Sequence, residues 1–467
     1  MADARPRGTL AGRRALLINV ALGLGTFLTL FDVTAVVVAM PAVAQDLGFG
    51  VAGLAWVIDA YSLAFTGALV ASGALADRFG RRRCLLAGNA VFLLASLACG
   101  AAGSGPMLLA ARAVQGVGAA GLTTGAIALL ADAFPNVTQR TRAFGVNGVI
   151  SGIAMASGPT LGGLLASWLG WRWVFFANVP FCLALAMAVP RLVAETSPSA
   201  RRRIDPVGIA LLALSLGLVV DALLRRDGAV LVRASALAGG LAAACLFGWQ
   251  QWRHPQPVLD PRVFATPVVA GACALIVALQ FGYWAVLVYL PLFLGTAFGL
   301  GMDTAGTALL AATLPMLLVP LVGGRFAVRR GWRHLFALAF GLLAVGDVLL
   351  VIAALSGQHA IGVAAAVAGM ATIGTGAALA NPQMAGVVLA HVPPAQSGMA
   401  SAVTMIARQA GFAIGIAGLG SALGSVEAAE AFAKPFALSA GLALLGVIVA
   451  LAVMPRRPSR FQIGSGP

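Results

Sequence analysis

Two segments decide the fold: GALADRFGRRR at residues 73–83 and GRFAVRRGWR at residues 324–333. They align without a gap, and two glycines and two arginines coincide. The alignment pairs Gly73 with Gly324, Arg78 with Arg329, Gly80 with Gly331 and Arg82 with Arg333. Each segment follows the second long apolar run of its half of the chain. The sequence therefore predicts two similar halves related as a parallel repeat.

Long apolar runs fill most of the remaining sequence. A hydrocarbon core about 30 Å thick requires roughly 20 apolar residues in a helix. Fourteen such runs are bounded by polar turns, at 16–40, 51–76, 84–103, 106–132, 142–169, 173–194, 207–224, 230–250, 266–298, 304–326, 334–355, 359–390, 397–424 and 435–454. The first run is expected to be an uncleaved span, because it is too long for a signal peptide. The expected fold class is an all-α polytopic membrane protein, in which 207–224 and 230–250 form a hairpin between two six-helix halves.

The composition excludes several classes of protein. Of the 467 residues, 60% are hydrophobic and 10% are charged, with a mean hydropathy of +0.96, which is unlike a soluble enzyme. The single lysine, Lys434, lies before Pro435 and cannot complete a nucleotide-binding P-loop. The five cysteines and four histidines have no metal-ligand spacing. We therefore expect no cofactor, no metal and no enzymatic activity.

The net charge of +15 comes mostly from arginine. If the N-terminus is cytoplasmic, 23 of the 30 basic residues fall on the cytoplasmic side and five on the outer side. Arg112 and Arg408 are the two that lie within spans. This distribution follows the positive-inside rule, so both termini are expected in the cytoplasm and the basic balance does not predict nucleic-acid binding.

Several motifs resemble one family. The segment 73–83 resembles the signature of its loop between spans two and three, and RAVQGVGAAG (112–121) resembles its fourth-span signature. The other matching segments are FDVTAVVVAMP (31–41), GPTLGG (158–163), GWRWVFFANVP (170–180) and RQAGFAIG (408–415). Together they resemble the major facilitator superfamily, in particular the fourteen-span drug/proton antiporter group of the QacA and EmrB type.

This resemblance implies an organisation in two halves. The expected parts are a cytoplasmic N-terminus (1–15), an N-terminal six-helix half (16–194), a linker with the extra hairpin (195–262), a C-terminal six-helix half (263–454) and a cytoplasmic tail (455–467). In such a fold the substrate binds between the halves, near the midplane of the membrane.

Three ionisable residues are predicted at one depth in the N-terminal half. At 1.5 Å per residue, Asp32 and Asp59 lie roughly 12 Å below the outer surface and Arg112 roughly 9 Å below it. Charges within the hydrocarbon region are costly and usually functional. We expect these three residues to couple transport to protons; the alternative is a static ion pair that holds the helices together.

Two sets of residues are expected to control the conformational change. The resemblance implies that the loop residues Asp77, Arg78, Gly80 and Arg82 stabilise one conformation; a solvated charged surface is the alternative. In the fifth span, small residues recur every three or four positions and form one face with a proline kink: Gly148, Gly152, Ala156, Pro159 and Gly163. The expected switch residues there are Gly158, Pro159, Gly162 and Gly163. This face is expected to close and open between the halves, although static packing remains compatible with the pattern.

The resemblance also suggests which side chains face the substrate. The candidate cavity residues are Phe27, Phe31, Gln115, Gln280, Tyr283, Trp284, Asn381, Met384 and Arg408. Arg408 is expected either to attract an anion or substrate carbonyl, or to cap backbone carbonyls of neighbouring helices. Asp221 with Arg225 is interpreted as a structural pair four residues apart. Asp347, deep in a peripheral span, has no assigned role.

The predicted function is a monomeric secondary antiporter of the inner membrane that exports hydrophobic small molecules, either neutral or cationic, in exchange for protons. One alternative is a dedicated exporter of a single host metabolite or antibiotic. Another is a non-transporting membrane sensor or lipid-handling scaffold, against which the buried charges count.

Overall fold

A computed structural model describes residues 12–134, 137–195, 205–224, 230–254, 266–320, 330–392, 397–423 and 428–455. The described chain is helical and contains no β-strand. The N-terminal helices are α1 (Gly12–Leu47), α2 (Val51–Phe79), α3 (Arg81–Gly100), α4 (Gly105–Ala133), α5 (Val137–Trp168), α6 (Arg172–Phe176) and α7 (Asn178–Leu192). The predicted repeat segment at 324–333 falls largely outside the described residues.

The later helices begin with α8 (Pro206–Leu224) and α9 (Val230–Arg253). They continue with α10 (Pro267–Leu279), the π-helix η2 (Gln280–Ala285), α11 (Val286–Phe298), α12 (Met302–Ala308), α13 (Leu310–Thr313), α14 (Pro315–Leu318), α16 (Trp332–Ser356), α17 (Ala360–Ala390), α18 (Ser397–Leu423), the 3₁₀-helix η4 (Ala429–Phe432) and α19 (Ala433–Val453). Thus α10, η2 and α11 form one continuous helix with a π turn in its middle.

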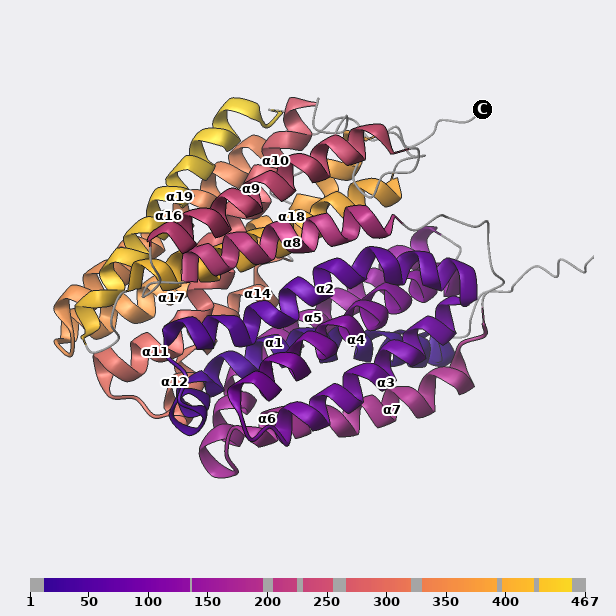
Figure 1. Cartoon of the computed structure of the whole chain (residues 1–467), viewed down its shortest axis with the longest axis horizontal. Helices are drawn as coiled ribbons and strands as arrows, with labels where there is room; N and C mark the ends of the chain where they lie inside the picture. Colours follow the sequence, from indigo (N-terminus) through magenta and orange to yellow (C-terminus); the bar gives the residue numbers. More distant parts are fainter. Residues whose placement is uncertain are drawn as a thin grey trace, which may run out of the picture.

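The helices form two bundles, which Figure 1 distinguishes by colour. The indigo-to-magenta bundle contains α1–α7, and the pink-to-yellow bundle contains α10–α19. The hairpin of α8 and α9 lies beside them, and α8 packs against α9, α2 and α18. The extra pair of helices therefore contacts both bundles through α8, as an inserted hairpin would.

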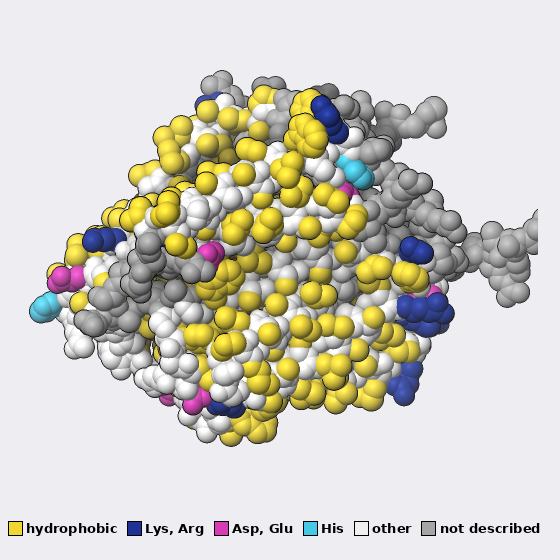
Figure 2. Space-filling view, in the orientation of Figure 1, with side chains coloured by type: hydrophobic (Ala, Val, Ile, Leu, Met, Phe, Trp, Pro, Cys, Tyr) yellow, Lys and Arg dark blue, Asp and Glu magenta, His cyan; other side chains and the backbone are white. Residues whose placement is uncertain are grey.

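Twelve helical segments of the described chain are long and apolar enough to cross a membrane. The remaining two predicted spans carry shorter apolar helices, Gly53–Leu69 and Met302–Leu318. The membrane-protein fold is thus confirmed, whereas the count of fourteen spans stays a prediction. In Figure 2, apolar side chains cover the middle of the visible face, and most charged side chains lie near its edges. This distribution is the one expected of a surface that contacts the hydrocarbon core of a membrane. The chain is a multi-pass membrane protein.

Backbone chemistry explains several helix ends and bends. Gly80 has a φ of 105°, which an L-side chain rarely adopts, and it forms the sharp turn between α2 and α3. Pro159 lies inside α5, where it removes one backbone donor and favours a bend. Both positions belong to the regions expected to control the conformational change.

Candidate functional site

The centre of the N-terminal bundle holds a buried ion pair between α1 and α4. Arg112 Nη1 lies 2.6 Å from Asp32 Oδ2, and both side chains are fully buried. Gln115 Nε2 and Asn178 Nδ2 each donate to Asp32 Oδ1 at 2.8 Å. Ser96 Oγ accepts from Gln115 Nε2 at 2.8 Å. The Asp32 carboxylate therefore receives hydrogen bonds from three side chains, which offsets the cost of burying its charge.

Helix α2 holds the other side of Arg112. The Arg112 Nε donates to the carbonyl oxygen of Val57 at 3.0 Å, and the guanidinium lies over the Tyr61 ring, 4.5 Å from its centroid. Arg112 Nη2 has no hydrogen-bond partner among the described residues. A cation over an aromatic face gains favourable energy in a desolvated site. The position of α2 consequently affects how tightly Arg112 is held on Asp32.

Asp59 is placed apart from this pair. Its carboxylate is fully buried, yet neither oxygen has a hydrogen-bond partner in the described structure. It precedes Tyr61, whose ring contacts Arg112, by two residues, and two residues correspond to a rotation of about 200° around α2. Asp59 therefore does not share the Arg112 face of α2, although the sequence predicts all three charges at one depth.

A cavity of about 270 Å³ lies between the two bundles. Its walls come from α1, α2, α4, η2 and α18. The lining residues are Thr26, Thr29, Leu30, Val33, Thr34, Tyr61, Ser62, Phe65, Thr123, Ile127, Gln280, Trp284, Met405, Arg408, Gln409 and Phe412. Tyr61 lines the cavity and also contacts Arg112, so one ring connects the cavity with the buried ion pair.

Three of the predicted cavity residues, Gln280, Trp284 and Arg408, line this cavity. Arg408 donates from Nη1 to Asn381 Oδ1 at 2.5 Å and from Nη2 to the Asn381 carbonyl oxygen at 3.0 Å. Asn381 therefore holds Arg408 in place without itself lining the cavity. This arrangement includes the contact with a backbone carbonyl that the sequence suggested, and it leaves part of the guanidinium facing the cavity.

The other predicted cavity residues lie elsewhere. Phe27 stacks on Phe31 with ring centroids 5.5 Å apart, and both rings contact Phe181 of α7. Tyr283 is fully buried and donates from Oη to the carbonyl oxygen of Ala312 at 3.0 Å. Gln115 belongs to the Asp32 cluster, and the Met384 side chain is buried within the core. These five residues pack within a bundle, and none is among those lining the cavity.

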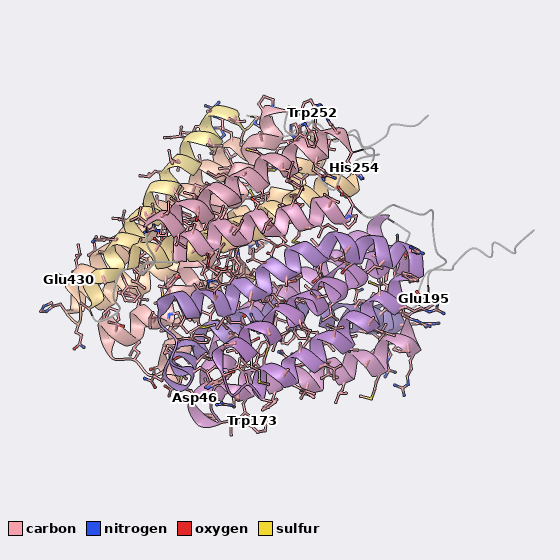
Figure 3. All side chains as sticks on the ribbon, in the orientation of Figure 1. Asp46, Trp173, Glu195, Trp252, His254 and Glu430 are labelled. Carbon is pink, nitrogen blue, oxygen red and sulfur yellow. The ribbon has the colours of Figure 1, made fainter. Side chains whose placement is uncertain are left out.

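The loop between α2 and α3 is fastened by a carboxylate that follows α7. Glu195 Oε1 accepts from the Arg82 backbone N–H at 2.9 Å, and Oε2 accepts from that of Arg83 at 3.1 Å. A Cβ on Gly80 would lie 2.7 Å from Glu195 Oε1, so glycine leaves room for this contact. Arg82 Nη1 also donates to the Val193 carbonyl at 3.0 Å. Figure 3 shows Glu195 at the opposite end of the N-terminal bundle from Asp46 and Trp173.

The remaining two loop residues contribute less to this contact. The Arg78 guanidinium lies 5.2 Å from the centroid of the neighbouring Phe79 ring, and the side chain is exposed. The side chain of Asp77 lies outside the described part of the structure, so the contact expected of it stays a prediction.

The small-residue face of α5 meets two different neighbours. A Cβ on Gly162 would lie 2.6 Å from the Ala35 carbonyl oxygen, and one on Gly158 would clash with Thr34, both in α1. Gly163 instead abuts Met302 of α12, and the Pro159 carbonyl lies 2.5 Å from where Gly306 would carry a Cβ. Gly158 and Gly162 thus pack within the N-terminal bundle, while Pro159 and Gly163 form the contact between bundles.

Several residues of these sites carry no clear signal in the sequence. Asn178 and Ser96 are uncharged residues in apolar spans. Glu195 lies in a polar segment that has no motif to distinguish it from an ordinary loop. Asp347, which had no assigned role, accepts a hydrogen bond from Ser439 Oγ at 2.6 Å, and both side chains are fully buried. This pair joins α16 to α19 inside the C-terminal bundle.

Comparison with known proteins places these features in a family. A model of the Major Facilitator Superfamily matches residues 22–416 and also 272–464. The multidrug resistance protein Stp of Mycobacterium tuberculosis is 32% identical over 344 residues, which cover 73% of this chain and 64% of Stp. The cephamycin export protein CmcT of Amycolatopsis lactamdurans is 37% identical over 307 residues, which cover 63% of this chain and 62% of CmcT. The chain thus spans a little under two thirds of the length of these relatives.

Solved transporters share the arrangement of helices. A crystal structure of the peptide transporter POT in complex with sulfate superposes with a TM-score of 0.70 at 17% identity, covering 96% of each chain. The D-xylose-proton symporter gives a TM-score of 0.68 at 16% identity, covering 94% of this chain and 98% of that one. At these identities the likeness is one of fold. Because the family model covers most of the sequence, the chain belongs to the Major Facilitator Superfamily.

Proposed function

We propose that this chain is a monomeric, proton-coupled antiporter of the inner membrane, with both termini in the cytoplasm. It exports hydrophobic small molecules by alternating access of the cavity between the two bundles. One observation carries the proposal: Tyr61 lines that cavity and its ring also contacts Arg112 of the fully buried pair of Asp32 and Arg112. Relatives named for multidrug resistance and cephamycin export support export of drug-like molecules.

The coupling follows from the two helices that hold Arg112. While α2 supplies the Val57 carbonyl and the Tyr61 ring, Arg112 is held on Asp32. If α2 moves relative to α4 when the cavity changes its opening, Arg112 loses these contacts and moves from the carboxylate. Asp32, once released by its cation, is the first acid proposed to exchange protons. Asp59, which already lacks a partner among the described residues, is the second acid proposed to exchange protons.

Two contacts are proposed to stabilise one conformation. The first is the approach of α5 to α12 at Gly163, Pro159 and Gly306, which joins the bundles. The second is the Glu195 carboxylate on the backbone of Arg82 and Arg83, which fastens the loop to the end of α7. Close backbone packing has few intermediate arrangements, so such contacts favour discrete open and closed states.

Transport into vesicles with an imposed pH gradient tests the proposal. The purified full-length protein is reconstituted, and uptake of a panel of cationic, neutral and anionic compounds is measured with and without the gradient. We expect gradient-driven uptake by the wild type and none by Asp32→Asn. Without a gradient, the Asp32→Asn variant is expected to exchange internal for external compound as the wild type does. Asp46→Asn, which changes an exposed acid, is the matched control. Wild-type coupling in Asp32→Asn would contradict the proposal.

A dedicated exporter of one antibiotic is the second candidate. The name of CmcT refers to a single class of compound, and the cavity is small, with an arginine held in one position. The same panel separates the two candidates: response to one compound supports the dedicated exporter, and response to several unrelated compounds supports multidrug efflux.

A further inference from the structure

The cavity between the bundles has one charged side chain in its wall, Arg408. A guanidinium has five N–H groups. Two of those of Arg408 bond Asn381, and the other three have no partner among the described residues. Three free N–H groups are enough for a two-point contact with a carboxylate, which matches the planar guanidinium in geometry.

Further polar atoms of the same wall lack partners. Trp284 Nε1, Gln280 Oε1 and the hydroxyls of Thr26 and Thr123 are buried, and none has a hydrogen-bond partner in the described chain. The indole N–H can only donate and the amide oxygen of Gln280 can only accept, whereas a hydroxyl can donate or accept. Unpaired buried polar atoms are costly, so a ligand that supplies acceptors would stabilise this wall. When the free N–H groups of Arg408 are included, the unpaired groups of this wall are mostly hydrogen-bond donors.

The two buried acids of the N-terminal bundle, Asp32 and Asp59, do not line the cavity beside Arg408. Asp32 is occupied by Arg112, Gln115 and Asn178, and no aspartate or glutamate lines the cavity. Charges interact more strongly in a site with little water than in bulk solution. The charge in the wall of the cavity is therefore positive, which disfavours a cation and favours an anion.

We infer that the cavity binds an amphipathic molecule with a carboxylate at its polar end. The carboxylate lies on Arg408, with the Trp284 indole N–H as a second donor. The apolar part packs on the side chains of Phe65 and Phe412, which line the same cavity. This inference rests on the proposed function, since it takes the cavity as the substrate site, and it replaces the expectation of cationic substrates.

Three probes with one aromatic body test the inference. They are 3-(2-naphthyl)propionate, its neutral amide, and a trimethylammonium analogue of similar length, each titrated into the full-length protein in nanodiscs by calorimetry. We expect the propionate to bind at least about tenfold more tightly than the amide, because a hydrogen bond to a charged group is strong. Arg408→Gln is to remove this difference while leaving amide binding within about twofold. Arg408→Lys is to retain part of it, since the charge remains.

Arg191→Gln is the matched control, because it removes an equally charged but exposed side chain of α7. It is expected to bind all three probes as the wild type does. If Arg408→Gln does not fold, Trp284→Phe keeps the aromatic wall and removes only the N–H, and a several-fold loss confined to the propionate is expected. Equal or tighter binding of the ammonium probe, propionate selectivity that survives Arg408→Gln, or no binding of any probe to the wild type would each overturn the inference.

Flux measurements separate this inference from the proposed function. Propionate selectivity that depends on Arg408, without gradient-driven transport of any compound, would refute the antiporter and leave the anion site intact. Gradient-driven transport confined to cations and lost in Asp32→Asn would do the reverse.

Discussion

Asp32 and Asp59 are both fully buried aspartates, but their surroundings predict opposite effects on stability. Asp32 accepts three side-chain hydrogen bonds, one of them from Arg112. Replacing it with Asn leaves a buried arginine without a counter-ion, which we expect to lower the free energy of unfolding by about 3–5 kcal/mol. Asp59 has no partner among the described residues, so Asp59→Asn is expected to leave stability unchanged or raise it.

Thermal and detergent-induced unfolding of the two purified variants measures this difference. Gradient-driven transport is measured alongside and is expected to fail in both, so the variants agree in function and differ in stability. A loss of stability in Asp59→Asn as large as that in Asp32→Asn would mean that Asp59 has a partner in the folded protein, and would contradict the assignment.

At the scale of the element, the two neighbours of α5 provide a matched pair of substitutions. Gly306→Ala places a methyl 2.5 Å from the Pro159 carbonyl, across the contact between bundles. Gly162→Ala places one 2.6 Å from the Ala35 carbonyl, within the N-terminal bundle. The first change strains only the conformation in which α5 meets α12, so it is expected to shift the population toward separation of these helices. The second strains packing inside one bundle and is expected to lower stability instead.

Distances between spin labels at Gln45 and Thr304, both exposed, report this separation in a background without native cysteines. We expect the distance between the labels to be longer in Gly306→Ala than in the wild type. In Gly162→Ala we expect the wild-type distance. If both variants leave the distribution unchanged while both lose stability, the α5–α12 contact is static packing.

The hairpin of α8 and α9 is closed at one end by Asp205, which precedes α8. Burial opposes ionisation of this carboxyl, but the Gly208 backbone N–H and the side chains of Gln250 and Gln251 donate to it, and His254 lies nearby. These contacts hold the pKa of Asp205 below its ordinary value. A lowered pKa in the folded state means that the ionised carboxylate contributes stability above the unfolded value, about pH 4. That contribution is lost as the pH falls through the folded value.

Asp205→Asn is therefore expected to be less stable than the wild type at pH 7, by about 0.5–1.5 kcal/mol, because hydrogen bonds to a charged acceptor are replaced by weaker ones. As the pH falls below about 4 the difference is expected to shrink, and the two proteins converge once the pH is below the folded value of Asp205. Unfolding of both proteins from pH 3 to pH 7 measures the difference, and Glu430→Gln, at an exposed position, serves as the control. A difference that does not change with pH would exclude a role for the ionised carboxylate.

The elements were largely predictable from the sequence, whereas the rotation of each helix about its axis was not. Depth along a helix follows from residue number, so the meeting of Asp32 with Arg112 could be predicted. Asp59 is predicted at the same depth, but its side chain faces another way. Helix α1 is apolar on almost every side, so nothing in its pattern directs Phe27 and Phe31 toward Phe181 instead of the cavity. Partners such as Asn178 and Glu195 emerge only when distant helices are packed together.

At the scale of the whole molecule, the distribution of arginine predicts which ends of the helices face the cytoplasm. Figure 3 shows Glu195, Trp252 and His254 toward one end of the molecule, with Asp46, Trp173 and Glu430 toward the other. The first group lies near the basic segments expected in the cytoplasm. If α8 and α9 cross the membrane, Val230 and His254, at opposite ends of α9, must be accessible from opposite sides.

Single cysteines introduced into a background without native cysteines test this orientation and the count of fourteen spans together. An impermeant maleimide added to intact cells is expected to label Trp173→Cys and Val230→Cys, since both positions are exposed and predicted to face outward. His254→Cys is expected to react only after the cells are permeabilised. Outside labelling of Trp173→Cys but not Val230→Cys would mean that the hairpin does not cross the membrane, which leaves twelve spans. Outside labelling of His254→Cys without labelling of Val230→Cys would contradict the predicted orientation, because the two ends of a spanning helix lie on opposite sides of the membrane.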